Sequence, residues 1–234
     1  MQAKIYNLSL EILEYQDNFE RVISKDMTNN YYWSDDWSEE LYIKFAKLGF
    51  ISTTYDTKEG LVLLPELQFA YSILDFKNLH ISKKVKKLLH QENYKLSFGT
   101  HFEEIIQKIG EQHRDNWFKN EYVSLMQKLS QREDFDLKGV ALLDAKTEEL
   151  VAGEIGYSIG KTYTSLTGFS SRKKEHRDCG TLQLVLLAKK LEKYGYSFWN
   201  LGHPHMEYKK RLGAVTYTRE DFLKRWQEAI DLII

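Results

Sequence analysis

The sequence has 234 residues, 42% of them hydrophobic, and a formal net charge of −1. This length is enough for one large domain or two small ones, and the balanced overall charge gives no indication of a nucleic-acid-binding protein. Cys179 is the single cysteine, which excludes an internal disulfide framework and indicates a reducing compartment.

The sequence shows no signal for a membrane or for secretion. No apolar run reaches about 18 residues, and the N-terminus lacks the charged and then apolar order of a signal peptide. We therefore expect a soluble cytoplasmic protein that has no membrane partner.

Residues 1–78 are expected to form a small N-terminal α/β domain. The segment 36–39 has the spacing of a helix capping box, and an apolar helical face follows before Gly49. Residues 50–78 show strand and turn signals around Gly60 and Pro65. The helical face consists of Trp37, Leu41, Phe45 and Leu48.

Residues 79–234 are expected to form a second, larger domain. Ser82 can cap a helix that carries Val85, and the segment 94–99 is typical of a strand. Apolar periodicity predicts two more helices, one that ends at Gly110 and one that ends near Leu129. A strand over 138–144 and a strand remnant followed by a helix over 216–234 complete the pattern.

The central part of this domain lies between residues 150 and 214. The segments 150–157 and 162–169 are β-rich and flank Gly160, which supplies the positive φ of a tight hairpin. Asp178 can cap a following amphipathic helix, Gly195 sits where that helix stops, and the segment 196–201 is typical of a returning strand. The hairpin end and the helix N-terminus would present backbone N–H groups to an anionic or carbonyl ligand.

Three clusters of basic residues interrupt the balanced charge, and each is compatible with a solvated face or with a binding surface. The first cluster lies in the first two turns of the helix after Ser82, where the helix dipole disfavours cations, and this placement favours contact with a phosphate backbone. The clusters are Lys83, Lys84, Lys86 and Lys87; Arg172, Lys173, Lys174 and Arg177; and Lys209, Lys210 and Arg211.

Several segments, in order along the chain, resemble the bacterial leucyl/phenylalanyl-tRNA–protein transferases. They are LHISKKVKKLL, YKLSFGTHFEEII, Asn116-Trp117, LVAGEIGYSIGKTYTSLTGFSSR and RLGA, and the helix SDDWSEELYIKFAKLGF resembles the N-terminal domain of that family. The second half also resembles the arginyl- and leucyl-tRNA–protein transferases, at Gly180-Thr181, Leu201-Gly202 and Met206-Glu207-Tyr208-Lys209. The resemblance implies an α+β fold, in which a small N-terminal domain precedes a GNAT (acetyltransferase)-like domain with a mixed central sheet flanked by helices.

The resemblance also implies a reaction, the transfer of an amino acid from a charged tRNA to the N-terminal amine of a protein, which marks that protein for degradation by the N-end rule. The reaction is aminolysis of an activated ester, and it requires positioning of both substrates and stabilisation of an oxyanion. The expected partners are aminoacyl-tRNA as co-substrate and a protein N-terminus or small amine as acceptor. No metal or redox cofactor is expected, and we expect a monomer.

Five residues match positions of known role in the family. Trp117 matches a tryptophan that lines the aminoacyl-adenosine site, and Tyr163 and Phe169 match aromatic positions near the aminoacyl pocket. Thr167 matches a serine in the Gly-Glu-Ser-Met-Phe-Ser run of the family, and Arg172 matches the arginine that closes this run. The resemblance thus implies substrate binding by the first four and contact with tRNA by Arg172 and the first lysine cluster. The alternative is that the aromatic residues are ordinary core and Arg172 an ordinary surface residue.

The sequence departs from the family at its acidic positions. Leu166 stands where the family has the glutamate of Gly-Glu-Ser, and Asn200-Leu201-Gly202-His203 replaces an Asp-Cys-Gln signature. Asn200 can orient a group or donate to an oxyanion but cannot act as a base, so His203 is the nearest candidate for a catalytic base. The alternative is that His203 and His205 are turn residues around Pro204.

Glu154 falls where the family has an apolar residue that helps form the pocket for the transferred side chain. A buried carboxylate is costly unless it is paired. We therefore hypothesise that Glu154 pairs with a polar or basic aminoacyl side chain, which would alter the donor specificity. The alternative is that the strand is shifted and Glu154 faces water.

Two other function classes remain open. An acyl-CoA-dependent N-acyltransferase, with acetyl-CoA as donor, would use the same fold, but the segment 177–182 matches a pyrophosphate-binding loop only in part. A non-catalytic relative that binds tRNA or a protein N-terminus would also retain the basic helix and the aromatic residues. Cys179 beside Arg177 could be an activated nucleophile, but an incidental cysteine is the simpler interpretation.

Overall fold

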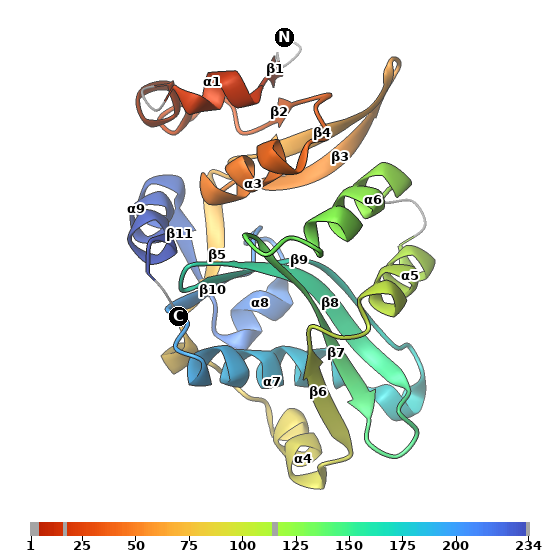
Figure 1. Cartoon of the computed structure of the whole chain (residues 1–234). Helices are drawn as coiled ribbons and strands as arrows, with labels where there is room; N and C mark the ends of the chain where they lie inside the picture. Colours follow the sequence, from red (N-terminus) through yellow and green to blue (C-terminus); the bar gives the residue numbers. More distant parts are fainter. Residues whose placement is uncertain (1–4, 16–17, 114–116, 233–234) are drawn as a thin grey trace.

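A seven-stranded mixed sheet forms the centre of the computed structural model, which describes residues 5–15, 18–113 and 117–232 (Figure 1). Its strands follow the order β11-β5-β10-β9-β8-β7-β6. Neighbouring strands are antiparallel except β9 and β10, which run parallel and are connected through α7. The strands are β5 (Ala70–Leu74), β6 (Tyr94–Phe98), β7 (Asp136–Asp144), β8 (Leu150–Ile159), β9 (Thr162–Ser170), β10 (Phe198–Asn200) and β11 (Val215–Thr218).

Helices cover both faces of this sheet. Because side chains alternate along a strand, Val140 and Leu142 of β7 pack in the core beneath α7, whereas Ala141 and Leu143 pack in the opposite core, which α5 and α6 share. This α+β arrangement confirms the predicted fold class. The helices are α1 (Leu10–Glu14), α3 (Glu39–Lys47), α4 (Lys83–Gln91), α5 (Phe102–Gln112), α6 (Asn120–Leu129), α7 (Cys179–Lys193), α8 (Glu207–Leu212) and α9 (Arg219–Ile230).

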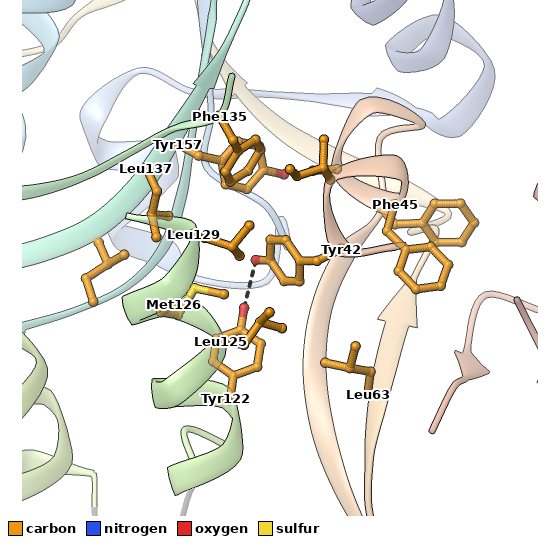
Figure 2. Close-up of a cluster of buried hydrophobic side chains, with 14 of the residues drawn as sticks. Tyr42, Phe45, Leu63, Tyr122, Leu125, Met126, Leu129, Phe135, Leu137 and Tyr157 are labelled. Carbon is orange, nitrogen blue, oxygen red and sulfur yellow. Dashed lines mark hydrogen bonds between the residues drawn. The ribbon is translucent and has the colours of Figure 1, made fainter. Parts of the chain in front are cut away.

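The N-terminal part of the chain packs on the α6 side of the sheet. It contains the parallel pair β1 (Tyr6–Asn7) and β2 (Tyr32–Trp33), helix α3, and a hairpin of β3 (Ile51–Thr57) and β4 (Gly60–Glu66). The buried hydroxyls of Tyr42 on α3 and Tyr122 on α6 lie 2.8 Å apart in the shared core (Figure 2). The predicted domain boundary at residue 78 stays a prediction, and β5, which precedes that boundary, belongs to the large sheet.

Arg219, the first residue of α9, is fully buried, and its hydrogen bonds connect three parts of the chain. Its guanidinium donates to the carbonyl groups of Asp26 and Asn29, and also to those of Leu67 and Gln68. A buried arginine is tolerated where its five N–H donors find acceptors, and four backbone carbonyls supply them here. The side chain therefore connects the N-terminal segment, the β4–β5 connection and the last described helix.

Most elements agree with the sequence prediction, and the differences are local. The hairpin at Gly160, the helix capped by Ser82 and the strands on both sides of α7 are confirmed. Helix α5 continues past Gly110 to Gln112, and Ser38 rather than Asp36 is the N-cap of α3. Asp178 precedes α7 as predicted, but its left-handed backbone (φ 68°) leaves its side chain without a capping hydrogen bond. Within the described ranges, no helix is long and apolar enough to cross a membrane.

Candidate functional site

A pocket of about 540 Å³ lies where β9 and β10 separate. Strand β10 has three residues and pairs with β9 at residues 162–164, so residues 165–170 of β9 have no strand neighbour on that side among the described residues. The first turns of α7 close the gap with Gly180, Thr181 and Gln183. Further walls come from β8, from the end of α5 and from the segment 201–209. The last residues of β9 and the N-terminus of α7 thus both line this pocket, and the prediction that backbone N–H groups there bind a ligand stays a prediction.

Glu154 on β8 lines this pocket and is only 4% exposed. Its Oε1 atom accepts hydrogen bonds from the hydroxyls of Tyr163 (3.1 Å) and Ser165 (2.7 Å), and Ser165 in turn accepts one from the indole of Trp199 (2.9 Å). Burial raises the pKa of the Glu154 carboxyl from 4.5 to about 7, and these donors only partly offset that effect. The alternative that Glu154 faces water is therefore wrong.

Gln183 on α7 faces the same carboxyl from the other side of the pocket. Its side chain is 3% exposed and its proximity lowers the pKa of Glu154, yet its Nε2 atom makes no hydrogen bond of regular geometry with the described residues. A buried amide donor without a partner is costly. The Gln183 amide is thus available to a ligand that enters the pocket.

Lys209 on α8 is the cation of the pocket wall. Its side chain is buried, and its ammonium donates to the carbonyl oxygens of Leu201 (2.5 Å) and His203 (2.7 Å). Burial lowers the pKa of Lys209 from 10.5 to about 8, so the group is still charged near pH 7. The expectation of a solvated face is wrong for this residue. The sequence pattern Met206-Glu207-Tyr208-Lys209 contained it, but nothing in a run of three basic residues indicates which one is buried.

The predicted aromatic residues gather at the pocket. Trp117 and Phe169 line it, together with Thr167, and Trp117 packs edge-on against Tyr122 with ring centroids 5.1 Å apart. Tyr163 is fully buried and is not among the residues that line the pocket, but its hydroxyl donates to Glu154, which does line it. Their binding roles stay predictions, and Asn116, which the resemblance paired with Trp117, lies outside the described residues.

The leucyl/phenylalanyl-tRNA protein transferase family model matches residues 73–227, about two thirds of the chain and the whole of the pocket. The chain belongs to this family. Leucyl/phenylalanyl-tRNA protein transferases are enzymes that carry an amino acid from tRNA to the N-terminus of a protein.

Two relatives in this transferase family show how far the likeness extends. The chain is 25% identical to the leucyl/phenylalanyl-tRNA–protein transferase of Rubrobacter xylanophilus over 169 residues, which are 69% of this chain and 80% of that protein. It is 29% identical to the transferase of Hyphomonas neptunium over 163 residues, which are 68% of this chain but 59% of that protein. Among solved structures, FemX matches 89% of this chain and 75% of its own, with 13% identity and a TM-score of 0.47.

The two catalytic candidates at the Asp-Cys-Gln position of the transferase family, Asn200 and His203, do not line the pocket, although Leu201 between them does. Asn200 is buried, its Oδ1 accepts from the backbone N–H of Gly202 (2.9 Å), and its Nδ2 donates to Thr164 (3.5 Å). His203 instead directs its Nε2 toward the Glu66 carboxylate, 3.3 Å away on β4. Their catalytic roles stay predictions, and these contacts organise the loop after β10.

The predicted tRNA-binding residues lie in two separate places. Lys83, Lys84, Lys86 and Lys87 are exposed on α4, at the end of the molecule beside β6, and are not part of the pocket wall (Figure 1). Arg172 is exposed in a neighbouring hollow that shares Gln112, Phe169 and Ser170 with the pocket. Of these residues, Arg172 alone adjoins the pocket.

Cys179 is fully buried, and burial raises the pKa of its thiol, which is the opposite of what an activated nucleophile needs. In the described part of the chain, no group of three His, Cys, Asp or Glu side chains is arranged to hold a metal ion. The groups of the pocket wall that can act on a substrate include the carboxyl of Glu154, the ammonium of Lys209 and the imidazole of His113, together with side-chain amides, hydroxyls and backbone N–H groups.

Proposed function

We propose that this chain transfers an amino acid from aminoacyl-tRNA to the N-terminal amine of a protein, and that the pocket between β9 and α7 holds the aminoacyl ester. The observation that carries the proposal is the position of this pocket within a chain of the transferase family, at the point where β9 and β10 part. Aminoacyl-tRNA is cytoplasmic, so we place the reaction in the cytoplasm, and we expect the monomer to be active.

The chemistry of the pocket fits an ester of a nucleotide. Trp117 and Phe169 supply apolar rings on which a base or an apolar side chain can pack. The Lys209 ammonium has three N–H donors, of which the two recorded carbonyl contacts use two. Together with the N-terminus of α7, it favours a phosphate or a developing oxyanion, because both carry negative charge.

The donor amino acid is the finer part of the proposal. Membership in the transferase family supports leucine or phenylalanine, whose side chains would rest against the aromatic wall. The hypothesis that Glu154 selects a polar or basic side chain stays a prediction, and a transfer assay distinguishes the two.

The assay supplies tRNA charged with one radiolabelled amino acid at a time to a peptide with a free N-terminus. Label on this peptide but not on its N-acetylated form supports the proposal, and the labelled amino acid identifies the donor. Label that arises only from acetyl-CoA, supplied in parallel, would show an acyl-CoA-dependent enzyme instead. Measurable binding of tRNA without any transfer would show a binding protein.

A pair of tryptophan variants tests whether this pocket is the donor site. Trp117→Ala should raise the KM for aminoacyl-tRNA by about fivefold or more, since stacking on one aromatic ring contributes about 1–3 kcal/mol. Trp33→Ala removes a half-buried tryptophan outside the pocket and should leave that KM unchanged. Equal KM values for both variants would place the donor elsewhere.

A further inference from the structure

The hydrogen bonds of Glu154 are one-sided. The two that the structure records reach Oε1, from Tyr163 and Ser165 on β9. Oε2 receives none of regular geometry from the described residues, although the carboxyl lies in the pocket wall and the Gln183 amide is close enough to lower its pKa. A carboxylate has about four lone-pair positions for donors. Glu154 is thus held firmly by one oxygen, while the other remains available to a donor that enters the pocket.

We propose that Glu154 is the proton acceptor for the incoming amine, so that its Oε2 atom takes a proton from the ammonium group of the acceptor while Ser165 and Tyr163 hold Oε1. This inference rests on the proposed function and adds a catalytic residue to it. It assigns the base of the reaction to β8, rather than to His203 in the loop after β10.

The reaction needs such a group because an ammonium has no lone pair with which to attack an ester. A protein N-terminus has an ordinary pKa of about 7.7–8.0, so most of it is protonated near pH 7. General bases work best when their pKa lies close to the working pH, and burial brings the pKa of Glu154 to about 7. The geometry places this carboxyl in the pocket, and burial brings its pKa close to that of the acceptor amine.

The other titratable groups around Glu154 leave it as the best placed base. Tyr163 and Tyr208 have pKa values raised by burial, so they stay neutral. Lys209 is charged near pH 7 and already donates to two carbonyls. His113 lines the pocket, and its Nε2 already contacts the carbonyl oxygen of Gly168, 3.1 Å away.

The proposed steps balance in protons and bonds. The acceptor ammonium gives one proton to Oε2 of Glu154 and becomes a neutral amine. The amine nitrogen attacks the ester carbonyl carbon, a C–N bond forms, and the negative charge on the carbonyl oxygen is stabilised by the donors of the pocket. As the C–O bond to the ribose breaks, the leaving ribose oxygen takes the second proton from the nitrogen, and Glu154 later releases its proton to solvent.

Leucine and phenylalanine side chains cannot supply a donor to Oε2. If these are the amino acids transferred, the side chain of the donor leaves the carboxyl without a hydrogen bond at this oxygen. The ammonium of the acceptor can supply both the hydrogen bond and the proton. A buried carboxyl that remains open to the pocket is therefore explained better by the acceptor than by the donor.

The test compares wild type with Glu154→Gln, which keeps the size of the side chain and an oxygen that accepts from Ser165 and Tyr163. Transfer from charged tRNA is measured across pH 5.5–9 (about the range that spans both pKa values) with two acceptors, a peptide N-terminus and hydroxylamine. Hydroxylamine is largely neutral at pH 7 and needs no base. Glu149→Gln, which removes an exposed carboxylate near the pocket, is the matched control.

We expect Glu154→Gln to slow transfer to the peptide about 100-fold or more at pH 7, the usual contribution of a general base, and to remove the rise in rate around pH 7. Transfer to hydroxylamine should remain close to the wild-type rate, and Glu149→Gln should match wild type with both acceptors. Equal losses with both acceptors would overturn the inference, since they would show a role in structure or in donor binding.

Two other results would also overturn it. One is a wild-type pH profile in Glu154→Gln together with a lost profile in His203→Gln, which would assign the base to His203. The other is transfer of a basic amino acid whose rate falls in Glu154→Gln with both acceptors, which would assign Glu154 to the donor side chain. Absence of transfer by wild type to either acceptor would refute the proposed function itself, and the inference with it.

Discussion

Replacing Glu154 by glutamine should stabilise the protein, and the gain should grow with pH. The carboxyl is buried, and its pKa rises from 4.5 in the unfolded chain to about 7 in the folded protein. Between these two values the folded state binds more protons than the unfolded state, so the stability of the wild type falls as the pH rises. Glutamine does not ionise and is free of this cost.

The size of the effect follows from the two pKa values. One pH unit corresponds to 1.36 kcal/mol, so a difference between 4.5 and about 7 is worth about 3 kcal/mol once both states are ionised. At pH 8.5 the variant should therefore be more stable by about 3 kcal/mol, and at pH 5 by about 1 kcal/mol. For a chain of this length, about 3 kcal/mol corresponds to a rise in Tm of about 6–12 °C.

Urea unfolding at pH 5 and pH 8.5 measures both differences, and an unchanged m-value shows that the unfolded state is comparable. Glu149→Gln is the control of opposite sign. The Lys173 ammonium lowers the pKa of the Glu149 carboxyl, so the stability that Glu149 contributes is present at neutral pH and is lost only as the pH falls. An equal gain for Glu154→Gln at both pH values, or no gain, would refute the reasoning, because the carboxyl would then titrate at its ordinary pKa.

Three further predictions concern the fold. Gly213→Ala should lower the stability measured by thermal unfolding by about 2–4 kcal/mol, because the φ of Gly213 is +106° and a Cβ would lie 1.9 Å from the Asn78 carbonyl oxygen. Gly195→Ala, where φ is +81° but the space is open, should lower it by only about 1 kcal/mol, and equal losses would contradict the predicted clash. Tyr122→Phe should destabilise the protein more than Tyr42→Phe in urea unfolding, because the Tyr122 hydroxyl donates to the Ser52 carbonyl (3.0 Å) and accepts from Tyr42. The double variant should reveal a coupling of about 1 kcal/mol, and the reverse order of the two single variants would refute this hydrogen-bond direction. Arg219→Lys should lower stability by about 2 kcal/mol or more, because an ammonium has three donors and cannot reach four carbonyls, and an unchanged Tm would show that the fork geometry is unimportant.

Local features of the fold could be predicted from the sequence because their causes are local. Gly160 supplies a backbone conformation that a hairpin needs, and Ser82 supplies the side-chain oxygen that caps α4 by accepting from the N–H of Val85 (3.3 Å). Helix α8 was missed because six residues are too few to show a helical period. The placement of β5 in the large sheet was also missed, since both its neighbours come from far along the chain.

The site was predictable only in outline. The sequence located the pocket wall near Trp117, Thr167 and Phe169 through the resemblance to the family. It could not show that Glu154 is buried, because β8 is buried at nine successive positions and gives no alternation from which to read an inner and an outer face. The pocket exists where β9 and β10 part, and that point depends on how few residues of β10 pair, which no local pattern encodes.

The position of β5 has a consequence for how the protein is made. A ribosome adds residues from the N-terminus onward, so β5 leaves the exit tunnel long before its neighbours β10 and β11 have been synthesised. Until then the apolar strand Ala-Tyr-Ser-Ile-Leu has two open edges, a state prone to pairing with other nascent chains. Arg219 is added still later, so the carbonyls of Asp26 and Asn29 also lack its guanidinium as a hydrogen-bond donor until then. The native sheet can therefore close only after β11 has been synthesised, and molecules interrupted before β11 should be targets for chaperones and proteases.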